Sequence, residues 1–380
     1  MKAKSSLSFI FCAVLAVTVS AQTTLSGSFI HDGILRAYRV YIPAMYNASV
    51  PVPLLFNLHG YGSNNVEQEI YGNFRPIADT AGFIVVHPNG TLDALNKRFW
   101  NTFGGSTVDD IGFISALIDT LSSDFNIDPN RIYSTGMSNG GFMSYELACG
   151  LSSRIAAIAS VAGSMIYSHM NSCGALHPTP VMEIHGTADG TVPYDGTAIF
   201  EPVSAVVDHW VQYNNCLATP AMTLVPDINL TDGCTAEHYV YNNGDSGSVV
   251  ELYKIIGGGH TWPGAPFVIG VTNMDFSAST EIWRFLRQFD LIGSGNTGIH
   301  SEVAESPAFS IFPNPSQSKF TISFADLSEK EITVSNYLGQ VFLQFLCKSN
   351  HAELNNLNKG IYLVSVKTEG QVFTEKIIKY

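Results

Sequence analysis

Short apolar segments rich in β-branched side chains recur along residues 24–256. We expect them to be strands, at residues 36–42, 53–58, 83–86, 131–135, 155–161, 181–184 and 249–256. Several are apolar almost throughout, as strands buried on both faces of a sheet must be. Helix-like stretches lie between them, including residues 109–125, 140–149, 197–213 and 277–289. Strands alternating with helices predict an α/β fold, a doubly wound and mostly parallel sheet with helices on both faces.

Two further patterns complete the domain organisation. The turn at His31-Asp32-Gly33 predicts that the first two strands form an antiparallel hairpin. After a first domain of residues 22–293, the polar and Gly-rich residues 294–308 have the composition of a linker. Short alternating strands then follow at residues 319–324, 331–336, 341–346, 361–367 and 372–379. This spacing predicts that residues 309–380 form a small all-β sandwich.

The first residues have the organisation of a secretory signal peptide. Lys2 and Lys4 precede an apolar run over residues 7–19, and small residues end at Ala21. We therefore expect residues 1–21 to be removed by cleavage before Gln22. Neither this run nor any later segment is long and apolar enough to cross a bilayer, so we expect a secreted protein with no membrane span.

Charge limits the partners. Loss of Lys2 and Lys4 with the signal peptide takes the formal net charge from −13 to −15, and because residues 309–380 carry +1, residues 22–308 carry −16. Such an acidic surface repels phosphate backbones and other strongly anionic polymers, so we expect no nucleic-acid partner. We expect a monomer.

The cysteines suggest a disulfide framework. Cys12 leaves with the signal peptide, and those that remain in an oxidising compartment are Cys149, Cys173, Cys216, Cys234 and Cys347. Their spacing suggests two local pairs, Cys149 with Cys173 and Cys216 with Cys234, each stabilising by about 3 kcal/mol. Cys347 would be left unpaired. The alternative is that some of these residues are buried free thiols.

Candidate chemistry begins with Gly136-Met-Ser-Asn-Gly140, which fits the G-x-S-x-G pattern between a predicted strand and a predicted helix. A sharp strand-to-helix turn leaves room only for Gly on either side of the serine and raises its hydroxyl above the sheet edge. This context is typical of the nucleophile in the α/β-hydrolase fold. The alternative is a glycine turn with a solvent-facing Ser138.

A serine nucleophile needs a histidine to accept its proton and an acid to orient the histidine. Asp189 follows the predicted strand at residues 181–184, and His260 follows the last strand of the sheet after a glycine run. We therefore predict a triad of Ser138, Asp189 and His260. Other residues are weaker candidates: Asp195 lies further along the same loop, Asp208 lies within a helix, His185 is expected to be a packed loop residue, and His238 a surface residue.

The oxyanion of an ester intermediate needs preorganised N–H donors. We expect them to be the backbone N–H of Asn139, directly after the nucleophile, and that of Tyr61, in the glycine-containing turn after residues 53–58. The alternative for this turn is an ordinary strand end. No metal-ligand spacing such as H-E-x-x-H or C-x-x-C occurs, so we expect no metal and no cofactor.

The catalytic part as a whole resembles the polyhydroxybutyrate depolymerase and feruloyl esterase family of extracellular esterases. The matching segments are Leu58-His-Gly-Tyr-Gly62, Trp100-Asn101, Val108-Asp-Asp-Ile-Gly-Phe113, Gly136-Met-Ser-Asn-Gly-Gly141, His185-Gly-Thr-Ala-Asp189, Val192-Pro-Tyr194 and Gly257-Gly-Gly-His-Thr-Trp-Pro-Gly264. The resemblance implies the triad above, paired cysteines around Cys216 and Cys234, and a substrate-site wall that includes Trp100 and Trp262. The alternative for both tryptophans is core packing.

The C-terminal part resembles the sorting domain of type IX secretion cargo, through Phe312-Pro-Asn-Pro-Ser316, Asn336-Tyr-Leu-Gly-Gln340, Leu357-Asn-Lys-Gly-Ile-Tyr-Leu363 and Lys376-Ile-Ile-Lys379. This implies the type IX secretion machinery as a partner and an extracellular or cell-surface location. The alternative is a carbohydrate-binding or adhesive sandwich.

These features together predict a secreted serine carboxylesterase. We expect its substrates to be feruloyl or related esters on plant-wall polysaccharide, because two tryptophans could stack on an aromatic acid and no separate polymer-binding domain is evident. The alternative substrate is a polyhydroxybutyrate polyester. A serine peptidase usually carries an additional domain for which this chain has no room, and a non-catalytic adhesion protein would not require the triad.

Overall fold

The structure is a computed structural model that describes residues 22–292, 309–314, 316, 318–324, 328–335, 341–368 and 371–379. The chain forms two compact units, divided between residues 297 and 298. The predicted signal peptide (1–21) and linker (294–308) lie outside the described residues, as does the whole segment Asn336–Gln340 that contributes to the second resemblance.

A ten-stranded mixed sheet forms the centre of the first unit, in the order β1-β2-β4-β3-β7-β8-β9-β12-β11-β10. Its strands are β1 (Thr23–His31), β2 (Ile34–Ile42), β3 (Val52–Leu58), β4 (Ile84–Pro88), β7 (Ile127–Met137), β8 (Ala157–Val161), β9 (Val181–Gly186), β10 (Ala221–Leu224), β11 (Thr235–Tyr241) and β12 (Val250–Ile256). The six central strands from β4 to β12 are parallel, and an antiparallel pair flanks them at each edge. The predicted mostly parallel sheet is confirmed.

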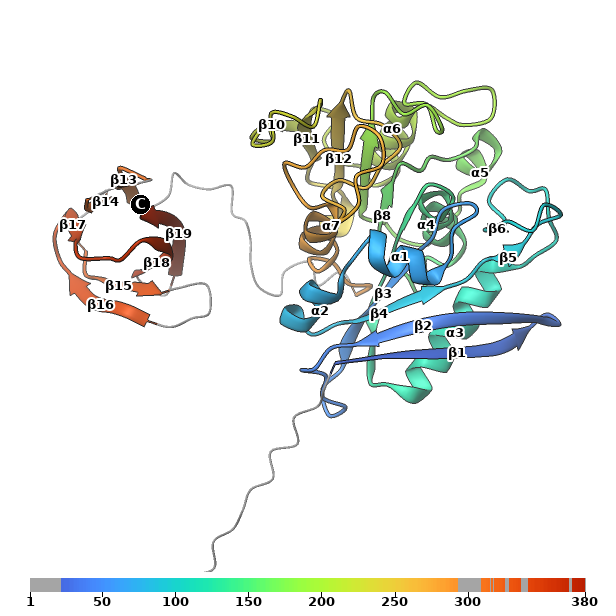
Figure 1. Ribbon diagram of the computed structural model, residues 1–380, viewed down its shortest axis with the longest axis horizontal. Coiled ribbons are helices and arrows are strands. Elements are labelled where there is room, and N and C mark those ends of the chain that lie inside the picture. Colours follow the sequence, from blue (N-terminus) through green and yellow to red (C-terminus); the bar gives the residue numbers. More distant parts are fainter. Residues whose placement is uncertain are drawn as a thin grey trace, which may run out of the picture. The chain divides into compact units, whose positions relative to one another are not determined.

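Helices cover both faces of this sheet (Figure 1). They are α1 (Asn65–Tyr71), α2 (Arg75–Ala81), α3 (Asp110–Asp124), α4 (Asn139–Gly150), α5 (Tyr167–Ser172), α6 (Val203–Tyr213) and α7 (Ala278–Leu286), with a 3₁₀ turn at Asp245–Gly247. Apolar side chains of α3, α4 and α6 belong to one buried core, and those of α2 and α7 belong to a second. The strands between the two cores are buried on both faces, which explains their mainly apolar sequences.

The first hairpin has the predicted pairing. Strand β1 is antiparallel to β2, with His31 opposite Ile34. Asp32 and Gly33 both have positive φ, at 47° and 77°, as a two-residue turn matched to the twist of the strands requires. A second, smaller hairpin, β5 (Thr91–Leu92) with β6 (Arg98–Phe99), was not predicted because its strands have two residues each.

The two predicted cysteine pairs have different outcomes. Cys149 and Cys173 form a disulfide with a Cα separation of 4.9 Å, as predicted. Cys216 and Cys234 are free, so the second pairing was wrong. Cys234 lies just before β11, whereas the residue after Cys216 donates its backbone N–H to the carbonyl of Asn242, beyond the other end of the strand. A strand of 7 residues spans about 24 Å, and a disulfide needs a Cα separation below about 7 Å.

The second unit is a two-sheet β structure, as predicted. One sheet has the order β13-β14-β17 and the other β16-β15-β18-β19. The strands are β13 (Phe309–Phe312), β14 (Phe320–Phe324), β15 (Lys330–Ser335), β16 (Val341–Cys347), β17 (His351–Leu354), β18 (Gly360–Thr368) and β19 (Gln371–Lys379). Alternate side chains from both sheets share one core, and Cys347 is a buried free thiol in it. Within the described residues, no helix has both the length and the apolar character of a membrane span.

Candidate active site

Ser138 lies at the turn from strand β7 into helix α4, at the carboxyl end of the parallel strands. Its backbone has φ 55° and ψ −121°, a strained conformation for a residue with a side chain. The Ser138 N–H donates to the carbonyl of Val161 on the neighbouring strand β8, 2.8 Å away, and this fixes the turn against the sheet. The serine is thus held in the strained position that strand-to-helix nucleophile turns use.

The glycines on either side of this turn have no room for a side chain. A Cβ atom on Gly136 would lie 2.6 Å from the carbonyl carbon of Gly140 and 2.7 Å from the carbonyl oxygen of Leu58. A Cβ atom on Gly140 would lie 2.2 Å from the same Leu58 oxygen. The crowding expected from the G-x-S-x-G pattern is therefore present.

Asp189 and His260 meet at the carboxyl ends of the adjacent strands β9 and β12. The Nδ1 atom of His260 lies 2.7 Å from Oδ2 of Asp189. The other carboxylate oxygen, Oδ1, accepts the N–H groups of Thr191 and Val192, each at 2.8 Å. Burial opposes ionisation, but the contacts with His185 and His260 hold the pKa of Asp189 well below its ordinary value. The acid is thus ionised, oriented and bonded to the imidazole.

The weaker candidates occupy other surroundings. Asp195 and Asp208 are exposed, and neither is bonded to a histidine within the described chain. His238 is partly buried in β11 and bonds Glu251, so it is not the expected surface residue. His185 is packed and hydrogen-bonded as expected, although in strand β9 rather than in a loop.

Ser138 reaches the same edge of the sheet through a different strand. Strand order places β8 between β7, which precedes Ser138, and β9, which precedes Asp189. Within the described residues the Ser138 hydroxyl makes no hydrogen bond, to His260 or to any other group. Such bonds are often long in unliganded hydrolases and tighten when substrate binds.

The two expected oxyanion donors have free N–H groups. In the part of the chain that the structure describes, no acceptor receives the backbone N–H of Tyr61 or Asn139. The turn that contains Tyr61 lies against the serine, because a Cβ atom on Gly60 would be 3.4 Å from Cβ of Ser138. His59 fixes the start of this turn: its Nδ1 donates to the Gly60 carbonyl at 2.8 Å and its Nε2 accepts the Gly90 N–H at 3.0 Å. Burial lowers the pKa of His59 to about 4, so the ring is neutral, as these two bonds require.

Trp100 and Trp262 do not form a substrate wall, and this prediction was wrong. Their exposed fractions are 0% and 1%. Trp100 packs on the His59 ring and donates its indole N–H to the His59 carbonyl at 3.0 Å. Trp262 packs edge-to-face on Phe74 and donates to Ser279 at 3.1 Å. Sequence alone could not separate these core positions from a wall, because Trp262 closely follows His260 and Trp100 lies in a predicted loop.

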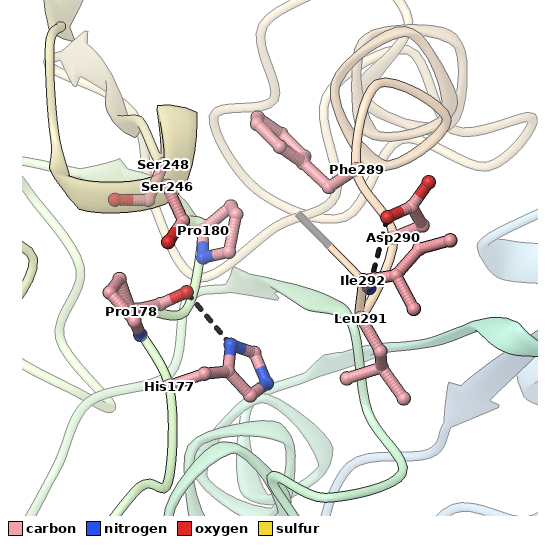
Figure 2. Close-up of a pocket in the computed structure, with 9 residues that line it drawn as sticks. All are labelled: His177, Pro178, Pro180, Ser246, Ser248, Phe289, Asp290, Leu291 and Ile292. Carbon is pink, nitrogen blue, oxygen red and sulfur yellow. Dashed lines mark hydrogen bonds between the residues drawn. The ribbon is translucent and has the colours of Figure 1, made fainter. Parts of the chain in front are cut away.

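A cavity of about 140 Å³ lies elsewhere (Figure 2). Its lining includes Pro180 and Ser248, which precede strands β9 and β12, so it lies at the edge of the sheet opposite Asp189 and His260. A larger hollow of about 640 Å³ lies beside the β5–β6 hairpin and is lined by Gly90, Asp93 and Arg98 among others. The described residues also bring His31, Asp32 and Asp109 together at metal-ligand distances, but the carboxylate of Asp109 already caps helix α3.

Comparison with known proteins relates the first unit to esterases. The family described as "Esterase PHB depolymerase" matches residues 36–197, which include Ser138 and Asp189. "Probable feruloyl esterase C" of Aspergillus clavatus is 31% identical over 222 residues, which cover 54% of this chain and 74% of the relative. The chain belongs to the esterase PHB depolymerase family. "Feruloyl esterase C" of Emericella nidulans is 32% identical over 192 residues, covering 48% of this esterase and 64% of the relative.

Some relatives are longer than this esterase. "Bifunctional acetylxylan esterase/xylanase XynS20E" of Neocallimastix patriciarum is 27% identical over 272 residues. The match covers 70% of this chain but only 36% of that protein.

The second unit has a separate match. The family described as "Secretion system C-terminal sorting domain" matches residues 310–380. This sorting domain implies secretion of the esterase, which for such cargo is often followed by attachment to the cell surface. The interpretation as a secretion signal is therefore favoured over an adhesive sandwich.

Proposed function

We propose that this protein is a serine carboxylesterase in which Ser138 is the nucleophile, His260 the general base and Asp189 the orienting acid. The hydrogen bond between His260 and the buried Asp189, 2.7 Å long, is the observation that carries the proposal. It leaves the Nε2 atom of His260 available for a serine hydroxyl. The strained backbone of Ser138 at the start of α4 supports the nucleophile assignment.

The reaction follows from these roles. Oγ of Ser138 attacks the ester carbonyl carbon while His260 accepts its proton, and the N–H groups of Tyr61 and Asn139 stabilise the oxyanion. His260 then protonates the departing alcohol, which leaves an acyl-enzyme on Ser138. Water that loses its proton to His260 attacks this ester, and the acid is released with the serine restored.

Replacement of Ser138 by Ala tests the nucleophile directly. The variant keeps the oxyanion donors but loses the covalent step, so turnover of p-nitrophenyl acetate should fall by about 10⁴ to 10⁶. A fluorophosphonate probe should label the wild-type chain and not the variant. A folded S138A protein that keeps several per cent of the activity would show that another residue is the nucleophile.

We propose feruloyl or related hydroxycinnamoyl esters on plant-wall oligosaccharides as the substrates. The names of two relatives support the aromatic acid. With both tryptophans buried, one aromatic side chain available for stacking is Phe103, which is 46% exposed and packs on Phe142 of α4 at a ring separation of 5.2 Å. Phe103 follows Thr102, whose hydroxyl accepts a hydrogen bond from Asn139 at 2.8 Å. Stacking on such a ring contributes about 0.5 to 1.5 kcal/mol beyond burial.

The hollow beside the β5–β6 hairpin suits the alcohol part of such a substrate. Its polar lining includes Asp93, which accepts a hydrogen bond from the Tyr61 hydroxyl at 2.6 Å. The hollow is thereby linked to the turn that supplies the proposed oxyanion donor. A sugar unit is the class of group that matches a wide and partly polar hollow.

A polyester such as polyhydroxybutyrate is the second candidate substrate, and one observation favours it. The loop that follows His260 exposes Phe267, Val268 and Ile269, with exposed fractions of 58% to 65%. The C-terminal end of this loop is hydrogen-bonded to the glycine run before His260, because the Gly259 N–H donates to the carbonyl of Val271 at 2.9 Å. Exposed apolar side chains beside a site can adsorb an apolar polymer.

Initial rates on methyl ferulate, an acetylated xylan oligomer and a polyhydroxybutyrate suspension separate these substrates. We expect methyl ferulate to be the best of the three, and Phe103→Ala to raise its KM about threefold to tenfold. Phe267→Ala is the matched control, with no effect on ferulate hydrolysis. Clearing of the suspension without ferulate release, and its loss in the Phe267 variant, would instead support the depolymerase.

A further inference from the structure

The proposed catalytic acid has a second imidazole beside it. His185, four residues before Asp189, has its Nε2 atom 3.4 Å from Oδ2 of Asp189. This is the same oxygen that His260 contacts at 2.7 Å. The His185 side chain is 0% exposed, so the oxygen lies between a buried ring and the partly exposed ring of the proposed base.

The partners of His185 favour a proton on both ring nitrogens. Nε2 lies 2.8 Å from the carbonyl oxygen of Val192, which can only accept. Nδ1 lies 2.8 Å from Oε1 of Glu183. Burial raises the pKa of Glu183, but the contact with His185 and the hydroxyl of Tyr145, which donates to the other Glu183 oxygen at 2.8 Å, oppose this and favour the carboxylate. The ring is therefore an imidazolium within a buried network.

The remaining groups around the ring are compatible with this charge. Tyr194 contacts it edge-on at a ring separation of 5.9 Å, and burial raises the pKa of Tyr194, so the phenol is neutral. Lys254, the partner of His185 in strand β12, places its ammonium over the ring of Tyr194, 5.6 Å from the ring centre. Burial lowers the pKa of His185, but its contacts with Asp189 and Glu183 outweigh burial and raise that pKa to about 9.

We propose that His185, held by Glu183, is a buried cationic positioning residue that orients Asp189 and opposes protonation of His260. The inference rests on the proposed triad. Attraction to the imidazolium holds Oδ2 of Asp189 between the two rings, while the N–H groups of Thr191 and Val192 hold Oδ1. A positive charge behind the acid disfavours a second positive charge on His260, so the base stays neutral, and the enzyme active, at lower pH.

A His–Glu pair elsewhere in the sheet provides a matched control. Nε2 of His238 lies 2.8 Å from Oε2 of Glu251, and the His238 ring stacks on Tyr253 at 4.1 Å. This pair is also partly or fully buried, but the described structure gives it no bond to Asp189 or His260. Loss of either pair should lower stability, whereas only loss of His185 should change the pH profile.

The test compares the wild-type chain with H185Q and H238Q, using kcat/KM for p-nitrophenyl acetate from pH 4.5 to 10. In H185Q the acid limb should move up by about one pH unit, so that activity at pH 5 falls about tenfold. H238Q should keep the wild-type acid limb. An unchanged limb in H185Q, or an equal shift in H238Q, would overturn the inference.

A second measurement does not depend on the folding of H185Q. In ¹⁵N-histidine spectra of the wild-type chain, one ring should remain doubly protonated at pH 8, and it should persist in H238Q. If every ring is neutral at that pH, the buried cation is absent. Failure of the triad proposal would be seen separately, as turnover retained by S138A.

Discussion

The side-chain amide of Asn139 exchanges two hydrogen bonds with the backbone of Trp100. Oδ1 of Asn139 accepts the Trp100 N–H at 2.7 Å, and Nδ2 donates to the Trp100 carbonyl at 3.1 Å. Trp100 in turn bonds the carbonyl of His59, at the start of the turn that contains Tyr61. The two proposed oxyanion donors are therefore connected through one buried indole.

Asn139→Ala should reduce turnover although the backbone N–H remains. Loss of the amide frees the Trp100 segment, and misplacement of a site by about 1 Å can lower the rate about 100-fold. Asn214→Ala is the control, because the buried Asn214 makes the same paired bonds to the backbone of Thr179, at 2.8 and 2.6 Å. It should lower stability and leave kcat unchanged. Equal effects of the two variants on kcat would mean that Asn139 acts only through stability.

Substitutions of the two aspartates on the loop after β9 identify the acid. Asp189→Asn should lower kcat by about 10⁴, because the amide no longer holds His260 in the required tautomer. Asp195→Asn should have no effect, since Asp195 is exposed. Loss of activity in the Asp195 variant with Asp189 tolerated would move the assignment. The assay is hydrolysis of p-nitrophenyl acetate by proteins with matching circular dichroism spectra.

Much of this site follows from sequence because its positions depend on local rules. Glycines must flank Ser138 in a sharp turn, and residues after consecutive parallel strands share one sheet edge, so Ser138, Asp189 and His260 could be placed in order. Glu183 and His185 also had a detectable signal, because charged side chains two residues apart in an otherwise apolar strand face the same side and must be paired. This signal was not used.

Other features depend on tertiary distances that sequence spacing does not report. Cys216 and Cys234 are near in sequence but lie toward opposite ends of β11, which was itself missed because most of its residues are only partly buried. Trp100 could be placed beside the site but not inside the core, since burial is decided by His59 and the segments packed over it. Helices α1 and α2 were missed because each has only 7 residues.

The pH dependence of stability should report the charge of His185. Its pKa in the folded chain, about 9, lies above the ordinary 6.5. Its contribution to the free energy of unfolding is therefore complete below pH 6.5 and is lost as the pH rises toward 9, by up to about 3 kcal/mol. Asp189, whose pKa is lowered, contributes above about pH 4 and loses this contribution in acid.

Urea unfolding at pH 6 and pH 9, followed by tryptophan fluorescence, measures this loss. All four tryptophans of the chain lie in the first unit, at positions 100, 210, 262 and 283, so the signal reports that unit alone. The decrease in unfolding free energy between the two pH values should be smaller in H185Q than in the wild-type chain. A parallel decrease in both proteins would argue against a protonated His185.

The thiol count distinguishes the two disulfide arrangements. Denatured without reductant, residues 22–380 should give three titratable thiols, from Cys216, Cys234 and Cys347. A single thiol would indicate that Cys216 and Cys234 are paired.

Removal of the Cys149–Cys173 bond, by a double substitution to Ser, should lower the free energy of unfolding by about 3 kcal/mol, since the bond closes a loop with a sequence separation of 24.

A chain that ends at Ile292 should keep full esterase activity on soluble esters. The two cores of the first unit contain only residues before this point, and the core of the second unit only residues after it. The last residues of the first unit contribute to its own packing, because Tyr133 donates to the Phe289 carbonyl at 2.7 Å and the Leu291 N–H donates to Asn130 at 3.1 Å. A chain that ends at Leu286 lacks both bonds and should be less stable, which makes it the control.

We expect kcat/KM of the 22–292 chain within about twofold of the full chain, and loss of secretion when the sorting domain is absent. If the purified and folded 22–292 chain fails to hydrolyse p-nitrophenyl acetate, the second unit must take part in catalysis and its role cannot be sorting alone.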